Sequence, residues 1–112
     1  MATPRPLAHG DRGAVAAAHP LAVKAGLTIL AEGGNAADAM IAAQATLAVV
    51  APCSCGVGGD MLALIRTAGG VEAVTGTGRA PSDPAFREAR PGGLAVTVPG
   101  AVAAWEAVSR RF

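Results

Sequence analysis

The sequence GGNAADA at residues 33–39 constrains the fold of this chain most strongly, because it joins two helical patterns. Its two glycines adopt a positive φ at low cost, so they can end the first helix in the left-handed conformation. Asn35 can then cap the second helix, and Asp38, at the third helical position, can reach back to the Asn35 backbone. The sequence therefore predicts a tight helix–turn–helix in which Gly33, Gly34, Asn35 and Asp38 have structural roles.

Apolar spacing predicts a helix on each side of this turn. The first runs from Leu21 to Glu32, with Pro20 in its first turn, where a missing N–H costs nothing. His19 is expected to cap or pack against it. The second runs from residue 36 to about residue 50 and is apolar nearly all round, so we expect it to be buried nearly all round. A chain of 112 residues offers little to cover such a helix, which indicates a fragment of a longer sequence.

The rest of the chain predicts a mixed α+β (α/β-type) order. Residues 1–12 are expected to form a loose lead-in, and residues 13–112 one domain. Residues 61–67 and 71–75 alternate like the strands of a hairpin with a turn between them. Four further segments are predicted: a short buried strand at 13–18, a loop at 76–91, a β-like run at 94–98, and a helix at 101–112 with Val102, Trp105, Val108 and Ser109 on one side.

Composition excludes several classes of partner. The chain is 52% hydrophobic, so it should fold around a core, and its net charge of +1 gives no reason to expect nucleic acid or an anionic membrane. An aromatic content of 3% argues against base stacking. The longest apolar run, 39–51, is shorter than the roughly 20 residues that span a bilayer, and no signal-peptide pattern is present. We therefore expect a cytoplasmic protein.

Two motifs that could indicate a cofactor are weak. Cys53 and Cys55 are one residue apart, whereas zinc needs four ligands, so we expect small side chains in a tight loop of a reducing-compartment protein. The glycines of 56–59 follow a helix and precede strands, which is the wrong context for a phosphate-binding loop. We interpret Gly58 and Gly59 as structural, requiring unusual backbone angles or close packing, with backbone N–H groups aimed at another anion as the alternative. No metal and no cofactor are expected.

Arg79 is the candidate binding residue. It lies in the sequence GTGRAP at 76–81, directly after a predicted strand. A guanidinium on a glycine-flanked strand exit can hold a carboxylate through two parallel hydrogen bonds. The alternative is a solvated loop arginine, which is how we interpret Arg87 and Arg90. Reasoning from the residues alone identifies no nucleophile.

An ordered series of short motifs resembles the start of the large subunit of the gamma-glutamyltranspeptidase family. The series covers about residues 13–112 and consists of GAVA at 13–16, HPLA at 19–22, AGL at 25–27, IL at 29–30, GGNAADA at 33–39, VAP at 50–52, GVGGDM at 56–61, AP at 80–81 and VPG at 98–100. The resemblance implies part of an N-terminal-nucleophile hydrolase fold, a four-layer αββα sandwich. It also implies a precursor that cuts itself into two subunits.

The resemblance further implies an activity. A threonine freed by self-cleavage attacks a gamma-glutamyl amide, such as that of glutathione, and the acyl group passes to water or to an amino acid. That threonine would lie beyond Phe112, so this piece would be inactive alone. Its partners would be the remainder of its own precursor and a small gamma-glutamyl substrate. The alternatives are a cephalosporin-acylase-like amidohydrolase of the same fold and a non-enzymatic truncated remnant.

One binding residue of the family should lie within this chain. It is the arginine that holds the substrate α-carboxylate, four places before the proline of the Ala-Pro pair. Thr77 occupies that place here, and Arg79 stands two residues later. The resemblance therefore implies that either Arg79 substitutes for the family arginine, with a local shift, or this branch does not hold a glutamyl carboxylate in this way. A different acyl group is then the alternative.

Overall fold

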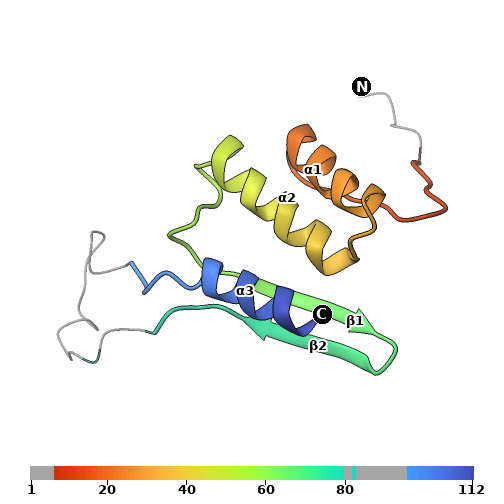
Figure 1. Ribbon diagram of the computed structural model, residues 1–112. Helices are drawn as coiled ribbons and strands as arrows, with labels where there is room; N and C mark the ends of the chain where they lie inside the picture. Colours follow the sequence, from red (N-terminus) through yellow and green to blue (C-terminus); the bar gives the residue numbers. More distant parts are fainter. Residues whose placement is uncertain (1–6, 80–81, 83–95) are drawn as a thin grey trace.

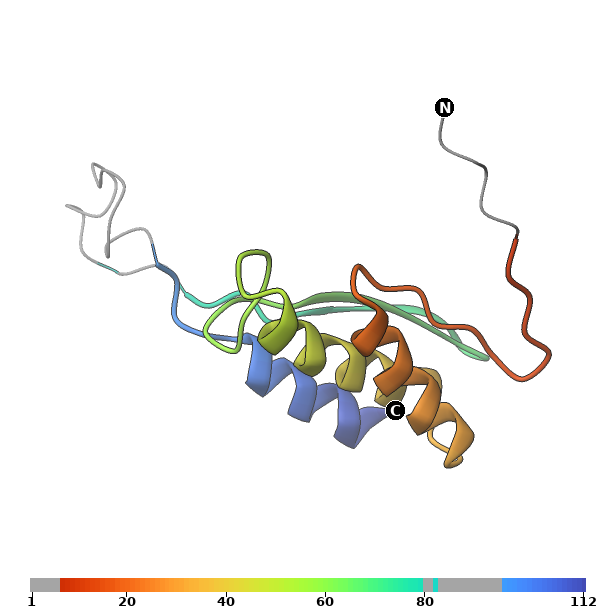
Figure 2. The same ribbon diagram turned by 90° about the horizontal axis from the view of Figure 1, so that it is seen from above.

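The computed structural model describes residues 7–79, 82 and 96–112. Its elements are α1 (Pro20–Ala31), α2 (Ala36–Val50), β1 (Leu62–Thr67), β2 (Gly70–Thr75) and α3 (Ala101–Arg111). The three helices lie in one layer with α2 in the middle, and the hairpin β1–β2 runs along one face of that layer (Figures 1 and 2). The predicted α+β class is confirmed, whereas the division of the chain at residue 12 stays a prediction.

The end of α1 has the geometry that the two glycines predict. Gly33 has a φ of +95°, and its N–H donates to the carbonyl of Leu30 at 3.3 Å. The N–H of Gly34 donates to the carbonyl of Ile29 at 2.9 Å. These two bonds form the paired arrangement in which a left-handed glycine satisfies the last carbonyls of a helix. The chain therefore reverses here without leaving the end of α1 unpaired.

Asn35 begins α2 with the predicted capping box. Its Oδ1 accepts from the N–H groups of Ala37 and Asp38, and Asp38 Oδ2 accepts from the Asn35 N–H at 3.0 Å. Asn35 Nδ2 also donates to the carbonyl of Phe112 at 3.0 Å. The same side chain thus joins the start of α2 to the end of α3, a contact that local sequence could not reveal.

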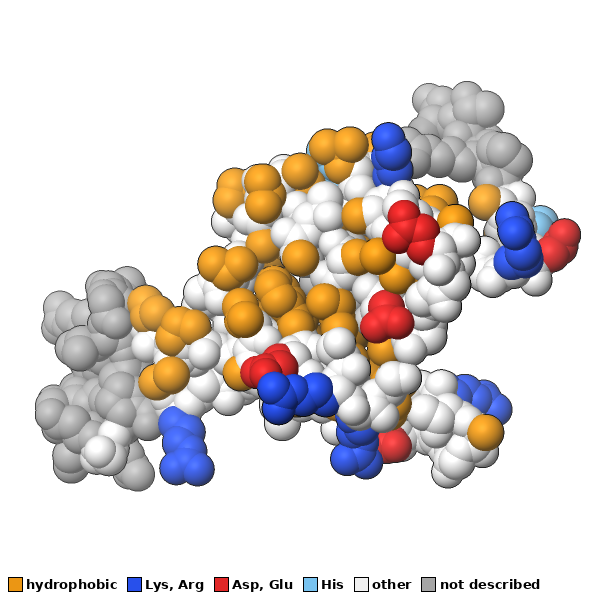
Figure 3. Space-filling model, viewed as in Figure 1, with side chains coloured by type: hydrophobic (Ala, Val, Ile, Leu, Met, Phe, Trp, Pro, Cys, Tyr) orange, Lys and Arg blue, Asp and Glu red, His pale blue; other side chains and the backbone are white. Residues whose placement is uncertain are grey.

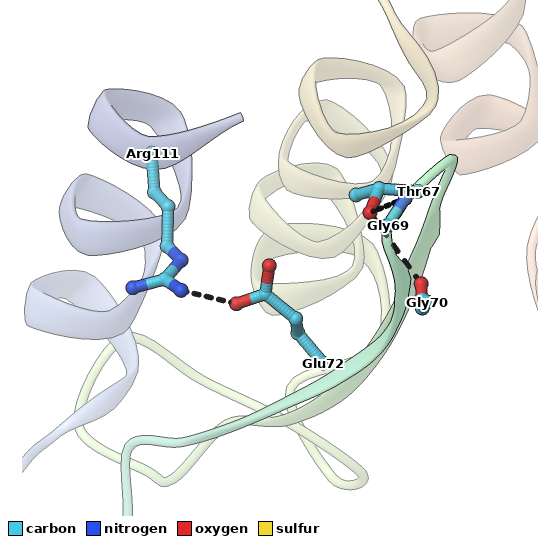
Figure 4. A network of polar contacts seen from close by, with 5 residues as sticks. All are labelled: Thr67, Gly69, Gly70, Glu72 and Arg111. Carbon is cyan, nitrogen blue, oxygen red and sulfur yellow. Dashed lines mark hydrogen bonds and ion pairs between the residues drawn. The ribbon is translucent and has the colours of Figure 1, made fainter.

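The hairpin forms as predicted, with a turn one residue shorter. Thr67 lies opposite Gly70, which has a φ of +133°, so the loop consists of residues 68–69. Thr67 Oγ1 accepts from the Gly69 N–H at 3.2 Å and donates to the Gly70 carbonyl, closing the turn (Figure 4). Next to this turn, the Glu72 carboxylate forms an ion pair with Arg111 of α3 (Figure 4). This pair attaches the last turn of α3 to β2.

The core lies between α2, α3 and the inner face of the hairpin. Trp105 of α3 reaches α2, where its Nε1 donates to Gln44 Oε1 at 2.7 Å. Most of the buried side chains are alanines, so each element can approach its neighbour closely but buries little area. The buried cluster consists of Ala37, Met61, Ala101, Ala104 and Val108, with Met40, Ile41, Ala63, Ile65, Val74, Trp105 and Phe112 packed against it.

The predicted facing of the last helix is wrong in part. Val108 is buried and Trp105 half-buried, as expected, but Val102 and Ser109 are exposed. Ala101 and Ala104 face the core instead, and a Cβ added at Gly76 would come within 2.4 Å of the Ala104 Cβ. The backbone of Gly76 approaches α3 closely, so the alanine side of the helix faces the core. A valine at this contact would push α3 away from Gly76.

The two short strands predicted outside the hairpin are not formed by the described residues, and α2 is less buried than predicted. Residues 13–18 form no strand, because no described segment supplies the backbone pairs that a strand needs. Residues 96–98 also form no strand, and residues 94–95 lie outside the described residues. In α2 only Ala37, Ala39 and Ala43 are buried, and Val49 is exposed, so the helix is covered on part of its circumference.

Apolar side chains stay exposed on both outer surfaces of the chain. On the helical face they gather over α1 and α2 (Figure 3). The large exposed apolar residues of the helices are Leu21, Leu27, Val49 and Val102, and those of the outer hairpin face are Leu62, Leu64 and Val71. Within residues 7–79, 82 and 96–112, no helix has both the length and the apolar character needed to cross a membrane.

Candidate functional site

The candidate site is the segment that follows β2, residues 76–79, which we call the strand exit. It carries both residues that the sequence associates with a carboxylate, Thr77 and Arg79, and both are exposed. The Thr77 hydroxyl lies 3.2 Å from the hydroxyl of Thr75 at the end of β2. In the part of the chain that the structure describes, no ion pair engages Arg79. A guanidinium in this setting can meet an anionic ligand from solvent.

The strand exit packs backbone against backbone on residues 96–100, which we call the helix leader because they precede α3. A Cβ added at Gly78 would lie 1.6 Å from the Val98 carbonyl oxygen. A Cβ added at Gly100 would lie 2.0 Å from the Gly76 carbonyl oxygen. Only glycine permits these approaches, since the obstructing atoms belong to the backbone and cannot rotate away. The two segments therefore fix each other's course.

Asp60 holds these segments together, although sequence reasoning did not single it out. Its Oδ1 accepts from the Thr97 hydroxyl at 3.1 Å and from the Gly78 N–H at 3.4 Å. The carbonyl of the preceding Gly59 accepts from the N–H groups of Gly100 and Ala101. Asp60 appears in the sequence only as part of the GVGGDM motif, and no spacing rule connects it to positions 78 and 97.

The glycine loop, residues 53–59, differs from the expectation. Neither Gly56 nor Gly58 has a positive φ, and a Cβ added at either would meet no atom within 4 Å. A Cβ at Gly59 would lie 3.3 Å from the Gly56 carbonyl oxygen, so a side chain there would require a small shift of the backbone. The structural reason proposed for Gly58 is therefore absent from the described part of the chain.

Cys53 and Cys55 are exposed free thiols, not side chains packed inside the loop. The Cys55 thiol points back to the Ala51 carbonyl at the end of α2, 3.8 Å away. Among the described residues, no group of three or more His, Cys, Asp or Glu side chains could hold a metal ion.

The other residues with predicted roles lie away from the strand exit. Asn35, and with it the GGNAADA turn, contacts the carboxyl end of α3 through Phe112, whereas the strand exit contacts the amino end through Gly100. Because α3 has 11 residues, about 16 Å of helix separates the two ends. His19 also stays structural, since its Nδ1 accepts from the Leu21 N–H at 3.2 Å and caps α1.

Comparison with known proteins finds relatives that match nearly the whole chain. The model of the gamma-glutamyltranspeptidase family matches residues 22–112. The chain is 39% identical to the acylase ACY 1 proenzyme of Pseudomonas sp. (strain V22) and 38% identical to the glutathione hydrolase-like YwrD proenzyme of Bacillus subtilis (strain 168). Each alignment covers 92% of this chain and 22% of the relative. The chain thus spans about a fifth of the length of these curated relatives.

Structure comparison agrees with the sequence comparison. The crystal structure of Helicobacter pylori gamma-glutamyltranspeptidase superposes with a TM-score of 0.78 at 35% identity. The match covers 96% of this chain and 34% of that one.

Proposed function

The chain belongs to the gamma-glutamyltranspeptidase family, and we propose that the full-length protein that carries it is a gamma-glutamyltransferase/hydrolase. The observation that carries the proposal is the match of residues 22–112 to the family, in a chain that superposes on a solved gamma-glutamyltranspeptidase. The fold is accordingly a part of the N-terminal-nucleophile hydrolase sandwich, and the acylase ACY 1 and YwrD relatives are proenzymes.

We place the chemistry outside these 112 residues. A threonine in the remainder of the precursor would attack the gamma-glutamyl carbonyl, and the acyl group would pass to water or to an amino acid. The part described here would supply substrate binding and a packing surface for the rest of the precursor. The cytoplasmic location that the sequence predicts stays a prediction.

Arg79 is the residue we propose for the substrate α-carboxylate. It lies at the surface of the strand exit, and a guanidinium offers a carboxylate two parallel donors. Thr77, at the place of the family arginine, offers one hydroxyl that already lies 3.2 Å from the Thr75 hydroxyl. A hydroxyl carries no charge, so Thr77 alone would bind a carboxylate less strongly than an arginine.

Three nitroanilides test the proposal on the full-length protein. Gamma-glutamyl nitroanilide carries both the amine and the α-carboxylate, 4-aminobutyryl nitroanilide lacks the carboxylate, and glutaryl nitroanilide lacks the amine. The proposal expects turnover of the first and a lower kcat/KM for the second, because the carboxylate contact is lost. No turnover of the gamma-glutamyl compound by processed protein would contradict it.

A second candidate function is an amidohydrolase with a different acyl group, like the cephalosporin-type acylases. Two observations favour it: the arginine of the family pattern is replaced by Thr77, and an acylase proenzyme is among the most similar relatives. Under this alternative the glutaryl or 4-aminobutyryl compound is cleaved at least as fast as the gamma-glutamyl compound. The same set of substrates therefore separates the two candidates.

A further inference from the structure

Asp60 occupies the point where three segments of the chain meet. It lies between the glycine loop and β1, and its Oδ1 accepts from the strand exit at Gly78 and from the helix leader at Thr97. The two donors are 18 and 37 residues away in sequence. One carboxylate oxygen therefore joins segments that no local interaction could hold together.

The backbone on both sides of Asp60 is also fixed. The Gly59 carbonyl accepts from the N–H groups of Gly100 at 3.1 Å and Ala101 at 3.0 Å. The Met61 carbonyl accepts from the N–H of Gly76 at 2.7 Å, and the Met61 side chain is fully buried. Asp60 is thus held from both sides, while its own side chain is exposed. Because the backbone at Asp60 is fixed, its carboxylate can hold the two segments that donate hydrogen bonds to it.

The strand exit has little room to follow any other course. Gly78 packs directly on the Val98 carbonyl, since a Cβ added at Gly78 would lie 1.6 Å from that oxygen, so displacement toward the helix leader is blocked. Displacement away from it would stretch the bond from the Gly78 N–H to Asp60 Oδ1, which is long at 3.4 Å. Asp60 therefore favours the observed course of the strand exit, and with it the place of the next residue, Arg79.

We infer that Asp60 is a positioning residue for acyl-group recognition, which holds the strand exit so that Thr77 and Arg79 are presented to the substrate. The inference rests on the proposed function, since it assumes that the strand exit contacts the acyl group. It assigns Asp60 no contact with substrate. Its essential property is the acceptor oxygen that receives the Gly78 and Thr97 hydrogen bonds, more than its negative charge.

Substitution in the full-length protein separates the acceptor from the charge. Asp60→Ala removes both, whereas Asp60→Asn removes the charge and keeps an Oδ1 acceptor. We expect Asp60→Ala to raise KM for gamma-glutamyl nitroanilide at least about fivefold with kcat within about twofold, and Asp60→Asn to restore KM to within about twofold. Thr97→Val, which deletes one donor and leaves Asp60 intact, should give an intermediate KM.

Amide hydrogen exchange tests the geometry without relying on activity. Asp60→Ala should raise exchange at residues 76–79 by about tenfold or more, while exchange in β1 and β2 stays unchanged and shows that the variant is folded. If Asp60→Ala does not fold, Thr97→Val provides the same two measurements.

The outcomes distinguish the inference from the proposed function. Unchanged exchange at 76–79, or equal KM values for Asp60→Ala and Asp60→Asn, would overturn the positioning role. An active wild-type protein whose KM is insensitive to Asp60→Ala would also overturn it. A wild-type protein without gamma-glutamyl turnover would instead refute the proposed function, and exchange would still decide whether Asp60 holds the strand exit.

Discussion

Two glycines of this chain differ sharply in what surrounds them. A Cβ at Gly78 would collide with the Val98 carbonyl oxygen, whereas a Cβ at Gly58 would meet open space. Neither has a positive φ, so the difference is one of packing and not of backbone conformation. Glycine at 78 is therefore required by the contact between strand exit and helix leader, and glycine at 58 is not required by any described neighbour.

Alanine substitution should show this difference in the full-length protein. Gly78→Ala is expected to destabilise by about 1–3 kcal/mol or more, because two backbone segments must separate. Gly58→Ala, the matched control, should be neutral or stabilise by up to about 1 kcal/mol through a less flexible unfolded chain. Denaturant unfolding measures both. Equal stability of the two variants would mean that the strand exit and helix leader are not in contact.

Arg79 gives a prediction about substrate binding at the same scale. Truncating an arginine that holds a buried substrate carboxylate costs roughly 2–5 kcal/mol, because the carboxylate is left unpaired. Arg79→Ala in the full-length protein should therefore raise KM strongly for gamma-glutamyl nitroanilide and little for the 4-aminobutyryl compound. Thr77→Arg in the Arg79→Ala background should recover binding if position 77 can reach the same carboxylate.

A small effect would identify Arg79 as a solvated surface residue. If Arg79→Ala changes the gamma-glutamyl kinetics by less than about twofold, or ~0.4 kcal/mol, the carboxylate is held elsewhere. An equal rise in KM for both compounds would point to general disturbance of the strand exit, which the exchange measurement on residues 76–79 would reveal.

At the scale of elements, Asn35 connects two helices with one side chain. It caps α2 through Oδ1 and bonds the carbonyl of Phe112, after α3, through Nδ2. We expect Asn35→Ala to lower the stability of the full-length protein by about 1–2 kcal/mol, since a lost cap alone typically costs about 1 kcal/mol. Thermal or denaturant unfolding measures the loss.

Asn35→Asp separates the two contacts, because a carboxylate keeps the capping oxygens and lacks the amide donor. Its stability should fall between those of the wild type and Asn35→Ala. The kcat of the folded fraction should stay unchanged in both variants, since the turn lies at the far end of α3 from the strand exit. A large loss of kcat without a loss of stability would contradict a purely structural role.

The elements predicted correctly are those with local signals. The bounds of α2 follow from Asn35 and Asp38 at its start, and the hairpin follows from alternation around a glycine turn. The wrong predictions concern segments whose structure depends on residues far away in the sequence. The facing of α3 depends on Gly76 approaching Ala104, and residues 13–18 need a neighbouring strand before they can become one. No periodicity within either segment contains that information.

The candidate site shows the same division. Arg79 was found because a glycine-flanked arginine follows a strand, which is a local pattern, and Thr77 because the family resemblance places an arginine at its position. Asp60 was missed because its importance comes from Gly78 and Thr97, which folding brings to it. The role of Gly78 likewise depends on the Val98 carbonyl and not on any feature of its own turn.

At the scale of the whole molecule, the described residues leave both outer surfaces apolar. Leu62, Leu64 and Val71 are exposed on the outer hairpin face, and Leu21 and Val49 on the helices. Scattered apolar residues are normal on a protein surface, but several on one sheet face usually mark a contact. We propose that the remainder of the precursor covers these faces.

The isolated chain of residues 1–112 should therefore associate with itself and show no enzymatic activity. Exposed apolar faces favour association, and the proposed threonine nucleophile lies outside these residues. Light scattering at increasing protein concentration should show growing particles, and Leu64→Lys, which places a charge on the outer hairpin face, should reduce them. Val102→Lys, on the helical surface, is the matched control for the contribution of the hairpin.

A monomeric isolated chain would show that these faces need no cover. Turnover of gamma-glutamyl nitroanilide above background would place a nucleophile within these 112 residues.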